Sequence, residues 1–149
     1  MFYDMGFYLN GWRYLEAAPA DIPGVWQWGT ERRDVNSTTN GIGNGKRNTQ
    51  IIVELLKEAR ETMKATQVAD AYEYNGFSDW FLPSKDELNQ MYINLKVGGL
   101  GGFQSGSYWS SSENTSFGLN PPFCQKFSNG EQSQAHKDTS LLVRPIRQF

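Results

Sequence analysis

The sequence is nearly free of the residues that build disulfides and metal sites. Its 149 residues include one cysteine, Cys124, and one histidine, His136. A single cysteine excludes an internal disulfide, and a single cysteine with a single histidine excludes a zinc site built from several such ligands. We therefore expect neither a metal nor a cofactor. A chain of this length can bury a sufficient hydrophobic core without them.

Long apolar runs and an excess of basic charge are also missing. The mean hydropathy is -0.60, and no run approaches the roughly 18 apolar residues of a membrane helix, so we expect no membrane insertion. No basic segment followed by an apolar stretch opens the chain, so no signal peptide is visible. Lysine and arginine total 14 against 16 aspartates and glutamates, a net charge of -2. This balance argues against nucleic acid as a partner, because phosphate binding needs a basic surface.

Aromatic residues and glycines are abundant instead. Aromatic side chains make up 14% of the chain, beside 15 glycines, which is typical of a loop-rich domain held together by aromatic clusters. We expect Trp12, Trp80 and Trp109 in the core, because each lies in a strand-like apolar segment. Trp26 and Trp28 flank a loop, so one of them is a candidate for exposure.

Two segments have the pattern of amphipathic helices. In residues 49–68, apolar side chains recur at helical spacing opposite a charged side, and Asn48 or Thr49 is the expected N-cap. Its predicted buried face consists of Ile52, Leu55, Leu56, Ala59 and Met63. A second helix begins at a capping box, in which Ser84 and Glu87 each satisfy a free backbone N–H of the first turn. Its predicted buried stripe consists of Leu88, Met91, Tyr92 and Leu95.

The remaining segments predict short strands joined by loops. The predicted strands are two within residues 2–14, with the second reaching residue 18, and one each at residues 108–112, 123–127 and 141–147. Ser128-Asn129-Gly130 has the composition of a hairpin turn, and residues 30–46 have that of a long surface loop. Two helices followed by a β-rich half predict a single α+β domain over residues 1–149.

No arrangement of residues indicates catalysis. Cys124 and His136 are a candidate thiolate–imidazole pair, but no local motif supports the pair, and packing is the simpler explanation of Cys124. The positions of Asp86 and Glu87 at a helix start explain both carboxylates. Residues 41–46 are glycine-rich, as phosphate-binding loops are, but they lack the spacing of those loops and a preceding apolar strand. We therefore expect no catalytic residue and no enzyme activity.

A series of motifs runs through nearly the whole chain in a fixed order. They are Phe2-Tyr3-Asp4, residues 11–19 (GWRYLEAAP), Trp28-Gly29, Gly41-Ile42-Gly43, Asn48-Thr49, residues 79–88 (DWFLPSKDEL), residues 108–113 (YWSSSE) and residues 143–147 (VRPIR). In this order they resemble the Lcl C-terminal domain family, a bacterial family typified by the end of a collagen-like adhesin. The family usually carries a few more apolar residues before Phe-Tyr-Asp, so the resemblance implies a shortened or trimmed first strand.

The resemblance implies a C-type-lectin-like fold of the formylglycine-generating-enzyme type. In that fold the first and last strands pair, so residues 2–3 should lie beside residues 143–149. The enzymes of this type use two cysteines, and calcium-dependent lectins carry a Glu-Pro-Asn or Gln-Pro-Asp tripeptide. This chain has neither feature, so we expect neither activity.

The resemblance leaves two functions open. Some members of the family resemble adhesins that bind sulfated glycans, often as homotrimers. Others resemble the variable proteins of diversity-generating retroelements, in which adenine-directed mutagenesis rewrites codons near the 3′ end of the gene. Both imply a location on a cell surface or a phage particle.

The variable-protein alternative makes a prediction about composition. Randomising both adenines of an AAY codon gives NNY, which never encodes Lys, Gln, Glu, Met or Trp. Residues 114–124 contain none of these amino acids and have neither a strand nor a helix period. Downstream, NNY-compatible residues are interleaved with Gln132, Gln134 and Lys137, which are not compatible.

We therefore expect a non-enzymatic binding module that displays diversified C-terminal loops to a protein or cell-surface ligand. Binding residues concentrate on loops held by a rigid scaffold, and Phe117, Leu119 and Phe123 would supply apolar anchors. The expected ligand-binding residues are Asn114, Thr115, Ser116, Phe117, Gly118, Leu119, Asn120, Phe123, Cys124, Ser133, Ala135, His136, Asp138, Thr139, Ser140 and Leu141.

The alternative is a fixed bacterial adhesin domain that binds sulfated glycans through basic loops. Its contacts would be Arg32, Arg33, Lys46, Arg47, Lys126 and Lys137. Binding to a polyanion weakens steeply with added salt, whereas apolar recognition does not, so ionic strength separates the two functions. A cysteine-dependent enzyme built on Cys124 is a third hypothesis, which replacement of Cys124 by serine would test.

Overall fold

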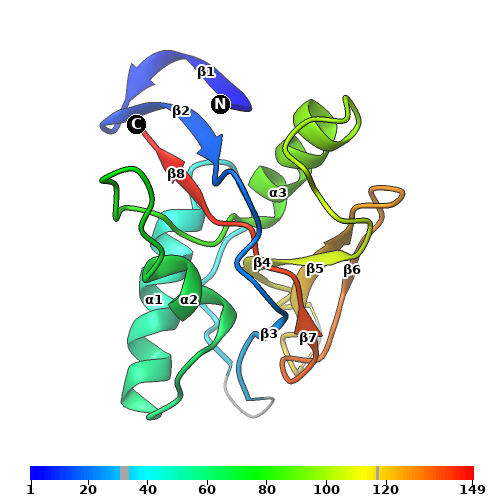
Figure 1. Cartoon of the computed structure of the whole chain (residues 1–149). Coiled ribbons are helices and arrows are strands. Elements are labelled where there is room, and N and C mark those ends of the chain that lie inside the picture. Colours follow the sequence, from blue (N-terminus) through cyan, green and yellow to red (C-terminus); the bar gives the residue numbers. More distant parts are fainter. Residues whose placement is uncertain (31–33, 117) are drawn as a thin grey trace.

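The computed structural model describes residues 1–30, 34–116 and 118–149, which form an α+β domain (Figure 1). The strands are β1 (Tyr3–Leu9), β2 (Trp12–Ala17), β3 (Trp26–Gln27), β4 (Ser107–Glu113), β5 (Pro122–Lys126), β6 (Gln132–Gln134), β7 (Ser140–Leu141) and β8 (Ile146–Gln148). The helices are α1 (Gly45–Glu58), α2 (Ala65–Asp70), α3 (Lys85–Met91) and a π-helical turn, η1 (Tyr92–Lys96). The predicted α+β class is confirmed.

The described strands form three small antiparallel sheets. Their strand orders are β1-β2-β8, β3-β7 and β4-β5-β6. Figure 1 shows both chain termini beside the β1-β2-β8 sheet, while β3, β6 and β7 lie toward the other end of the molecule. The strands predicted near residues 108–112 and 123–127 are confirmed as β4 and β5.

The implied pairing of the first strand with the last is wrong. β8 pairs with β2, through Leu15↔Gln148 and Ala17↔Ile146, and β1 lies on the outer side of β2. The physical reason is the hairpin at Asn10-Gly11, whose φ angles of 52° and 83° suit a tight turn that sets β1 against β2. β2 carries the buried Trp12 and Leu15, so it takes the central position over the core.

The predicted helix over residues 49–68 is wrong at both ends. α1 begins after Asn44, and the expected caps Asn48 and Thr49 are buried inside the helix. The side-chain amide of Asn48 bonds the backbone of the preceding loop, at 3.0 and 2.7 Å, instead of capping a helix. Arg60 and Met63 have left-handed φ angles of 58° each, which breaks the helix and leaves Met63 exposed.

The capping box of the second helix is confirmed. The N–H of Glu87 donates to Ser84 Oγ at 3.3 Å, and the Glu87 carboxylate accepts from the N–H of Ser84 at 2.8 Å. Leu88 and Met91 are on the buried face of α3, as the periodicity predicts. Because this motif is satisfied entirely by residues close in sequence, local reasoning locates it correctly.

The glycine-rich segment at residues 41–46 binds a carboxyl group, that of Glu87 of the same chain. The N–H groups of Gly43 and Gly45 donate to its carboxylate at 2.8 and 3.3 Å. A Cβ at Gly45 would collide with that carboxylate, so a glycine is needed there. Burial raises the Glu87 pKa to about 7, against the lowering effect of the Ser84, Gly43 and Gly45 N–H groups.

The core consists of two clusters of buried side chains. The first, beneath the β1-β2-β8 sheet and α3, contains Trp12 and Phe81, and the second, between α1 and β4, contains Trp28 and Trp109. Trp80 is also buried, so all three tryptophans predicted to be internal are internal. Trp28 is only 1% exposed, so it does not form an exposed platform.

The predicted closing strand over residues 141–147 is interrupted. β7 ends at Leu141 and β8 begins at Ile146, and the chain between them crosses from one sheet to another. Pro145 cannot donate to a sheet ladder, and Arg144 is buried with its guanidinium bonded to Asp21 at 2.7 Å and to the carbonyl of Ala18 at 3.0 Å. The turn predicted at residues 128–130 is confirmed as the β5–β6 connection.

Candidate ligand-binding site

The two segments predicted to form a ligand face meet around a cavity. The cavity has a volume of about 410 Å³, within the usual range of ligand sites. It is lined by Gly118, Leu119, Pro121, Gln134, Ala135, His136 and Lys137. Gly118, Leu119, Ala135 and His136 are among the residues expected from the sequence.

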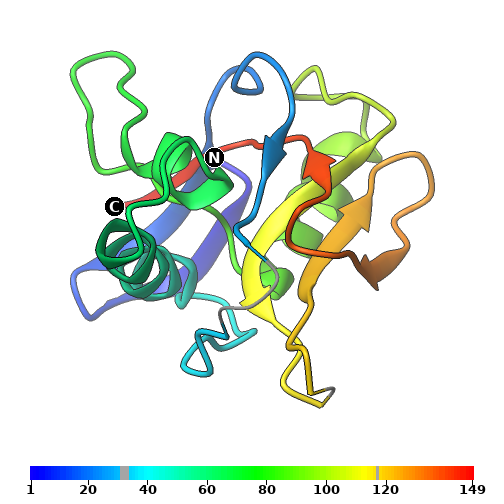
Figure 2. The same cartoon turned by 90° about the horizontal axis from the view of Figure 1, so that it is seen from below.

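The β5–β6 hairpin brings the two segments together. Its register sets Cys124 opposite Ser133 and Phe123 opposite Gln134, and the N–H of Ala135 donates to the carbonyl of Pro122 at 3.2 Å. The residues just before β5 therefore lie beside the residues just after β6. Figure 2 shows the loop between β4 and β5 projecting beyond the ends of these strands.

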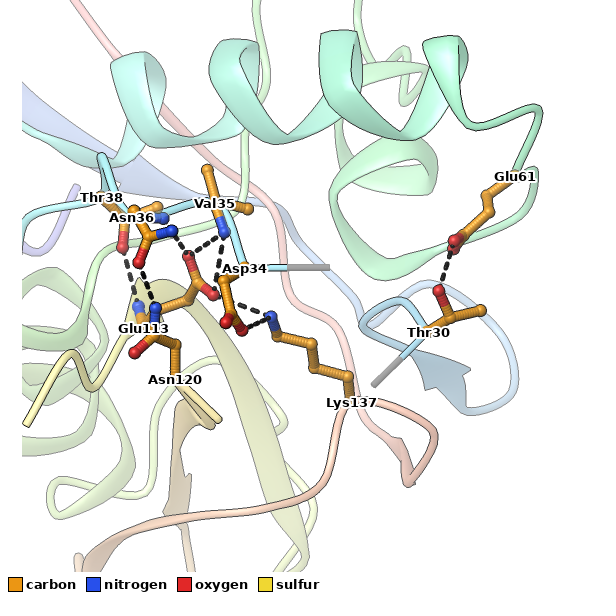
Figure 3. Close-up of polar contacts among 9 residues, drawn as sticks. All are labelled: Thr30, Asp34, Val35, Asn36, Thr38, Glu61, Glu113, Asn120 and Lys137. Atoms are coloured by element: carbon orange, nitrogen blue, oxygen red, sulfur yellow. Dashed lines mark hydrogen bonds and ion pairs between the residues drawn. The ribbon is translucent and has the colours of Figure 1, made fainter. Parts of the chain in front are cut away.

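The loop between β4 and β5 is closed at its base and anchored from one side. The N–H of Asn114 donates to the carbonyl of Pro121 at 2.9 Å, and the N–H of Ser116 donates to Asn114 Oδ1 at 3.0 Å. Asn120 is buried, and its side-chain amide donates to Asn36 (Figure 3). This anchored base presents the side chain of Leu119, which is 69% exposed. Asn120 therefore supports the face from below.

A buried ion pair lies under the cavity (Figure 3). The Glu113 carboxylate accepts from Lys137 Nζ at 2.8 Å and from the backbone N–H groups of Val35 and Asn36 at 3.1 and 3.2 Å. Lys137 Nζ also lies 3.4 Å from Asp34 Oδ1. Because Glu113 ends β4 and Lys137 follows β6, the pair ties both loops to the segment that precedes α1.

This burial corrects the role given to Lys137 in the polysaccharide alternative. Its side chain is 2% exposed, and its charge is bonded to two carboxylates, so it does not present a cation to a polyanion. Of the other proposed contacts, Lys126 is exposed on β5, and Arg47 on α1 donates to the carbonyl of Ser37 at 3.1 Å. Lys46 is half-buried at the start of α1. Arg32 and Arg33 lie outside the described residues, as does Phe117 of the expected ligand face.

The segment after β6 is docked on the body of the domain. The carbonyl of Lys137 accepts from the N–H groups of Trp28 and Gly29 at 2.9 and 3.1 Å, and the carbonyl of Asp138 accepts from Gln27 Nε2 at 3.1 Å. The N–H of Thr139 closes a turn onto the carbonyl of His136 at 3.0 Å. The exposed members of the predicted set in β6 and the segment after it are Ser133, His136, Asp138 and Ser140.

Two predicted members of the face lie elsewhere. Leu141 belongs to β7, pairs with Trp26 of β3 and packs against the second core cluster. Cys124 is buried in the same cluster, with its Sγ 3.5 Å from Ser133 Oγ, and burial raises its pKa. Both side chains pack against the core, Cys124 fully and Leu141 in part.

Several remaining members are half-buried at the edges of the face. They are Asn114, Phe123, Ala135 and Thr139. The Phe123 ring is covered by Lys85 Nζ, 4.5 Å from its centroid, so it is a weaker anchor than Leu119.

Three residues that line the cavity are not among the expected ligand-binding residues: Pro121, which lies within the NNY-compatible run, and Gln134 and Lys137, which NNY codons do not encode. A signal for Gln134 was present in the hairpin turn at residues 128–130, because counting outward from it sets position 134 opposite position 123. Lys137 gives no local signal, since its partner Glu113 is distant in sequence.

Among the described residues, no helix has the length and apolar character needed to span a membrane, and no cluster of three or more His, Cys, Asp or Glu side chains is arranged for a metal ion. A comparison with protein-family models and with curated proteins found no match to this chain.

Proposed function

We propose that this protein is a non-enzymatic binding module with a C-type-lectin-like fold, related to the Lcl C-terminal domain family. In this proposal it acts as a variable-protein-type receptor on a cell surface or a phage particle. Its loops over residues 114–121 and 133–140 contact a protein or cell-surface ligand by surface recognition, with no bond chemistry.

The observation that carries the proposal is the division between exposed and buried residues in these segments. Eight of the nine exposed residues described there are of types that NNY codons encode, and Gln134 is the exception; the eight are Thr115, Ser116, Gly118, Leu119, Ser133, His136, Asp138 and Ser140. Beneath and beside them, Glu113, Gln125 and Lys137 are buried and of types that NNY codons do not encode. A diversifying system needs this division, because replaceable residues must face the ligand while the frame stays constant.

The buried glutamine shows why such a frame residue must stay constant. Gln125 is fully buried, and its Nε2 donates to Asn89 Oδ1 at 2.9 Å and to the carbonyl of Gly130 at 3.0 Å. It thereby fixes the β5–β6 turn against α3. NNY codons encode no side-chain amide of this length, because Asn is one methylene shorter, so a replacement would cost these two hydrogen bonds.

The exposed part of the face favours a protein ligand. It combines hydroxyl groups and the apolar side chain of Leu119, and the buried charges of Glu113 and Lys137 are used in pairing each other. Recognition by such a surface should depend little on salt. A sulfated polysaccharide would instead require a cluster of accessible cations, and Lys137 is not one of them.

Deep sequencing of codons 105 to 149 in a population of the source organism tests the proposal. We expect substitutions concentrated at the exposed positions, with Glu113, Gln125, Lys137 and residues 143–149 unchanged. Substitutions spread evenly over buried and exposed codons would contradict it. A uniform sequence combined with salt-sensitive binding to heparin would favour the fixed adhesin.

A further inference from the structure

In the part of the chain that the structure describes, no strand pairs with one edge of the β4-β5-β6 sheet, which is called the open edge below. β6 is the outer strand on that side. The opposite edge is covered, because the N–H of Trp109 donates to the carbonyl of Leu142 at 3.0 Å and the N–H of Leu142 donates to the carbonyl of Ser107 at 3.1 Å. Figures 1 and 2 both show β6 on the outside of the molecule.

The hydrogen bonds of the hairpin determine which groups of β6 face outward. The N–H of Lys126 bonds the carbonyl of Glu131 at 2.9 Å, and the N–H of Ala135 bonds the carbonyl of Pro122 at 3.2 Å. Hydrogen-bonded and non-bonded pairs alternate along an antiparallel ladder. The register therefore places Gln132 opposite Gln125, and Gln134 opposite Phe123, in non-bonded pairs. The N–H and C=O groups of Gln132 and Gln134 thus point away from β5.

The open edge runs directly into the cavity. Gln134 is both the last residue of β6 and part of the cavity wall, and the wall continues through Ala135 to Leu119 and Pro121 on the facing loop. These three side chains are apolar. An extended chain that pairs with Gln134 and continues past it would carry its next side chains over the mouth of the cavity.

We infer that the open edge of β6 captures an extended segment of the protein ligand by strand addition, and that the cavity receives one apolar side chain of that segment. This inference rests on the proposed function, because the cavity belongs to the same ligand face. Outward N–H and C=O groups at strand spacing match an extended polypeptide backbone. The apolar walls, over a lysine already bonded to Glu113 and Asp34, favour an uncharged side chain.

The composition of the edge fits a diversified receptor. Gln132 and Gln134 are accessible residues that NNY codons do not encode, and they are the two residues whose backbone faces outward. Strand addition uses backbone groups, so it stays constant while the surrounding side chains vary. The constant edge would supply affinity, and the exposed loops would supply the choice of ligand.

The test begins with a phage-displayed library of random linear dodecapeptides selected against the whole protein. Enriched peptides are synthesised, and their Kd values are measured by calorimetry against the wild type and three variants. Gln134→Pro removes the outward N–H, a substitution that an edge strand tolerates. Gln134→Ala keeps that N–H and is the matched control. Ala135→Trp fills the cavity.

We expect Gln134→Pro to weaken binding at least about tenfold, because it removes roughly one hydrogen bond and disturbs the neighbouring ones. Gln134→Ala should change Kd less than about threefold. Ala135→Trp should abolish binding of the selected peptides. N-methylation along the peptide, which leaves the protein unaltered, should weaken binding at every second position. This scan keeps the inference testable if Gln134→Pro fails to fold.

Three results would overturn the inference: no peptide enriched above background, an N-methyl scan without a period of two, or equal binding to Gln134→Pro and Gln134→Ala. The proposed function is tested separately. If Thr115→Arg or Asp138→Arg abolishes binding of the selected peptides while the edge variants and the N-methyl scan have no effect, the ligand face stands and the strand-capture mechanism falls.

Discussion

Lys137 connects the two candidate loops to the scaffold, so replacing it by methionine is the sharpest perturbation of the frame. The substitution keeps the length and most of the volume of the side chain but removes the ammonium 2.8 Å from Glu113 Oε2. Removing one partner of a buried ion pair costs about 3–5 kcal/mol, because the other charge stays buried. The Glu113 carboxylate keeps the N–H groups of Val35 and Asn36, so we expect a loss of about 2–4 kcal/mol in the free energy of unfolding.

The assay is urea unfolding monitored by tryptophan fluorescence. The centroid of the Trp28 ring lies 5.1 Å from Lys137 Nζ, so this tryptophan reports on the region. Lys126→Met is the matched control, because Lys126 is exposed on the neighbouring hairpin, and it should change the unfolding free energy by less than about 0.5 kcal/mol. In a double-mutant cycle with Glu113→Gln, the two substitutions should couple by about 1–3 kcal/mol. A loss below about 1 kcal/mol for Lys137→Met, or additive effects, would refute the buried pair as the link between the loops.

Three further predictions concern the scaffold and the thiol. Burial raises the Glu87 pKa from 4.5 to about 7, so the folded state holds a proton that the unfolded state releases. The free energy of unfolding should therefore fall by about 3 kcal/mol as the pH rises from 4.5 to 7, and level off above 7. In urea titrations Glu87→Gln should flatten this profile, and an unchanged profile would contradict the assignment. Gly45→Ala should lower the free energy of unfolding by about 1–3 kcal/mol, because its methyl group collides with the Glu87 carboxylate. An unchanged free energy of unfolding would show that the loop shifts to make room. Cys124 should react with a thiol reagent far more slowly than free cysteine, and Cys124→Ser should leave ligand binding within about threefold, whereas loss of binding would place the thiol in the site.

Local signals located the elements whose determinants lie close in sequence. The capping box at Ser84 and Glu87 and the turn at residues 128–130 were predicted correctly, because the partners are a few residues apart. The start of α1 was missed because Asn48, a favourable cap in isolation, uses its side-chain amide to bond Thr39 in the loop that precedes the helix. The order of the terminal strands was missed for a similar reason, since it depends on which strand covers the core.

The candidate site likewise contains residues that the sequence could predict and residues that it could not. NNY compatibility, a criterion that the family resemblance supplied, selected the two segments that meet at the cavity, and the apolar side chain of Leu119 marked it as an anchor. It could not show that Cys124 and Leu141 point into the core or that Lys137 is buried against Glu113, because those facts depend on contacts across three separate segments. Burial of a charged residue is decided by its partner, and the partner is not visible locally.

Two matched display libraries would show whether replaceable exposed positions sit on a constant buried frame. One randomises with NNY codons the exposed positions Thr115, Ser116, Gly118, Leu119, Ser133, His136, Asp138 and Ser140. The other randomises Glu113, Gln125 and Lys137 with the same NNY codons. Resistance to protease on the display host measures the folded fraction of each. We expect most members of the first library to stay folded and most members of the second to unfold. Equal resistance in the two libraries would contradict it.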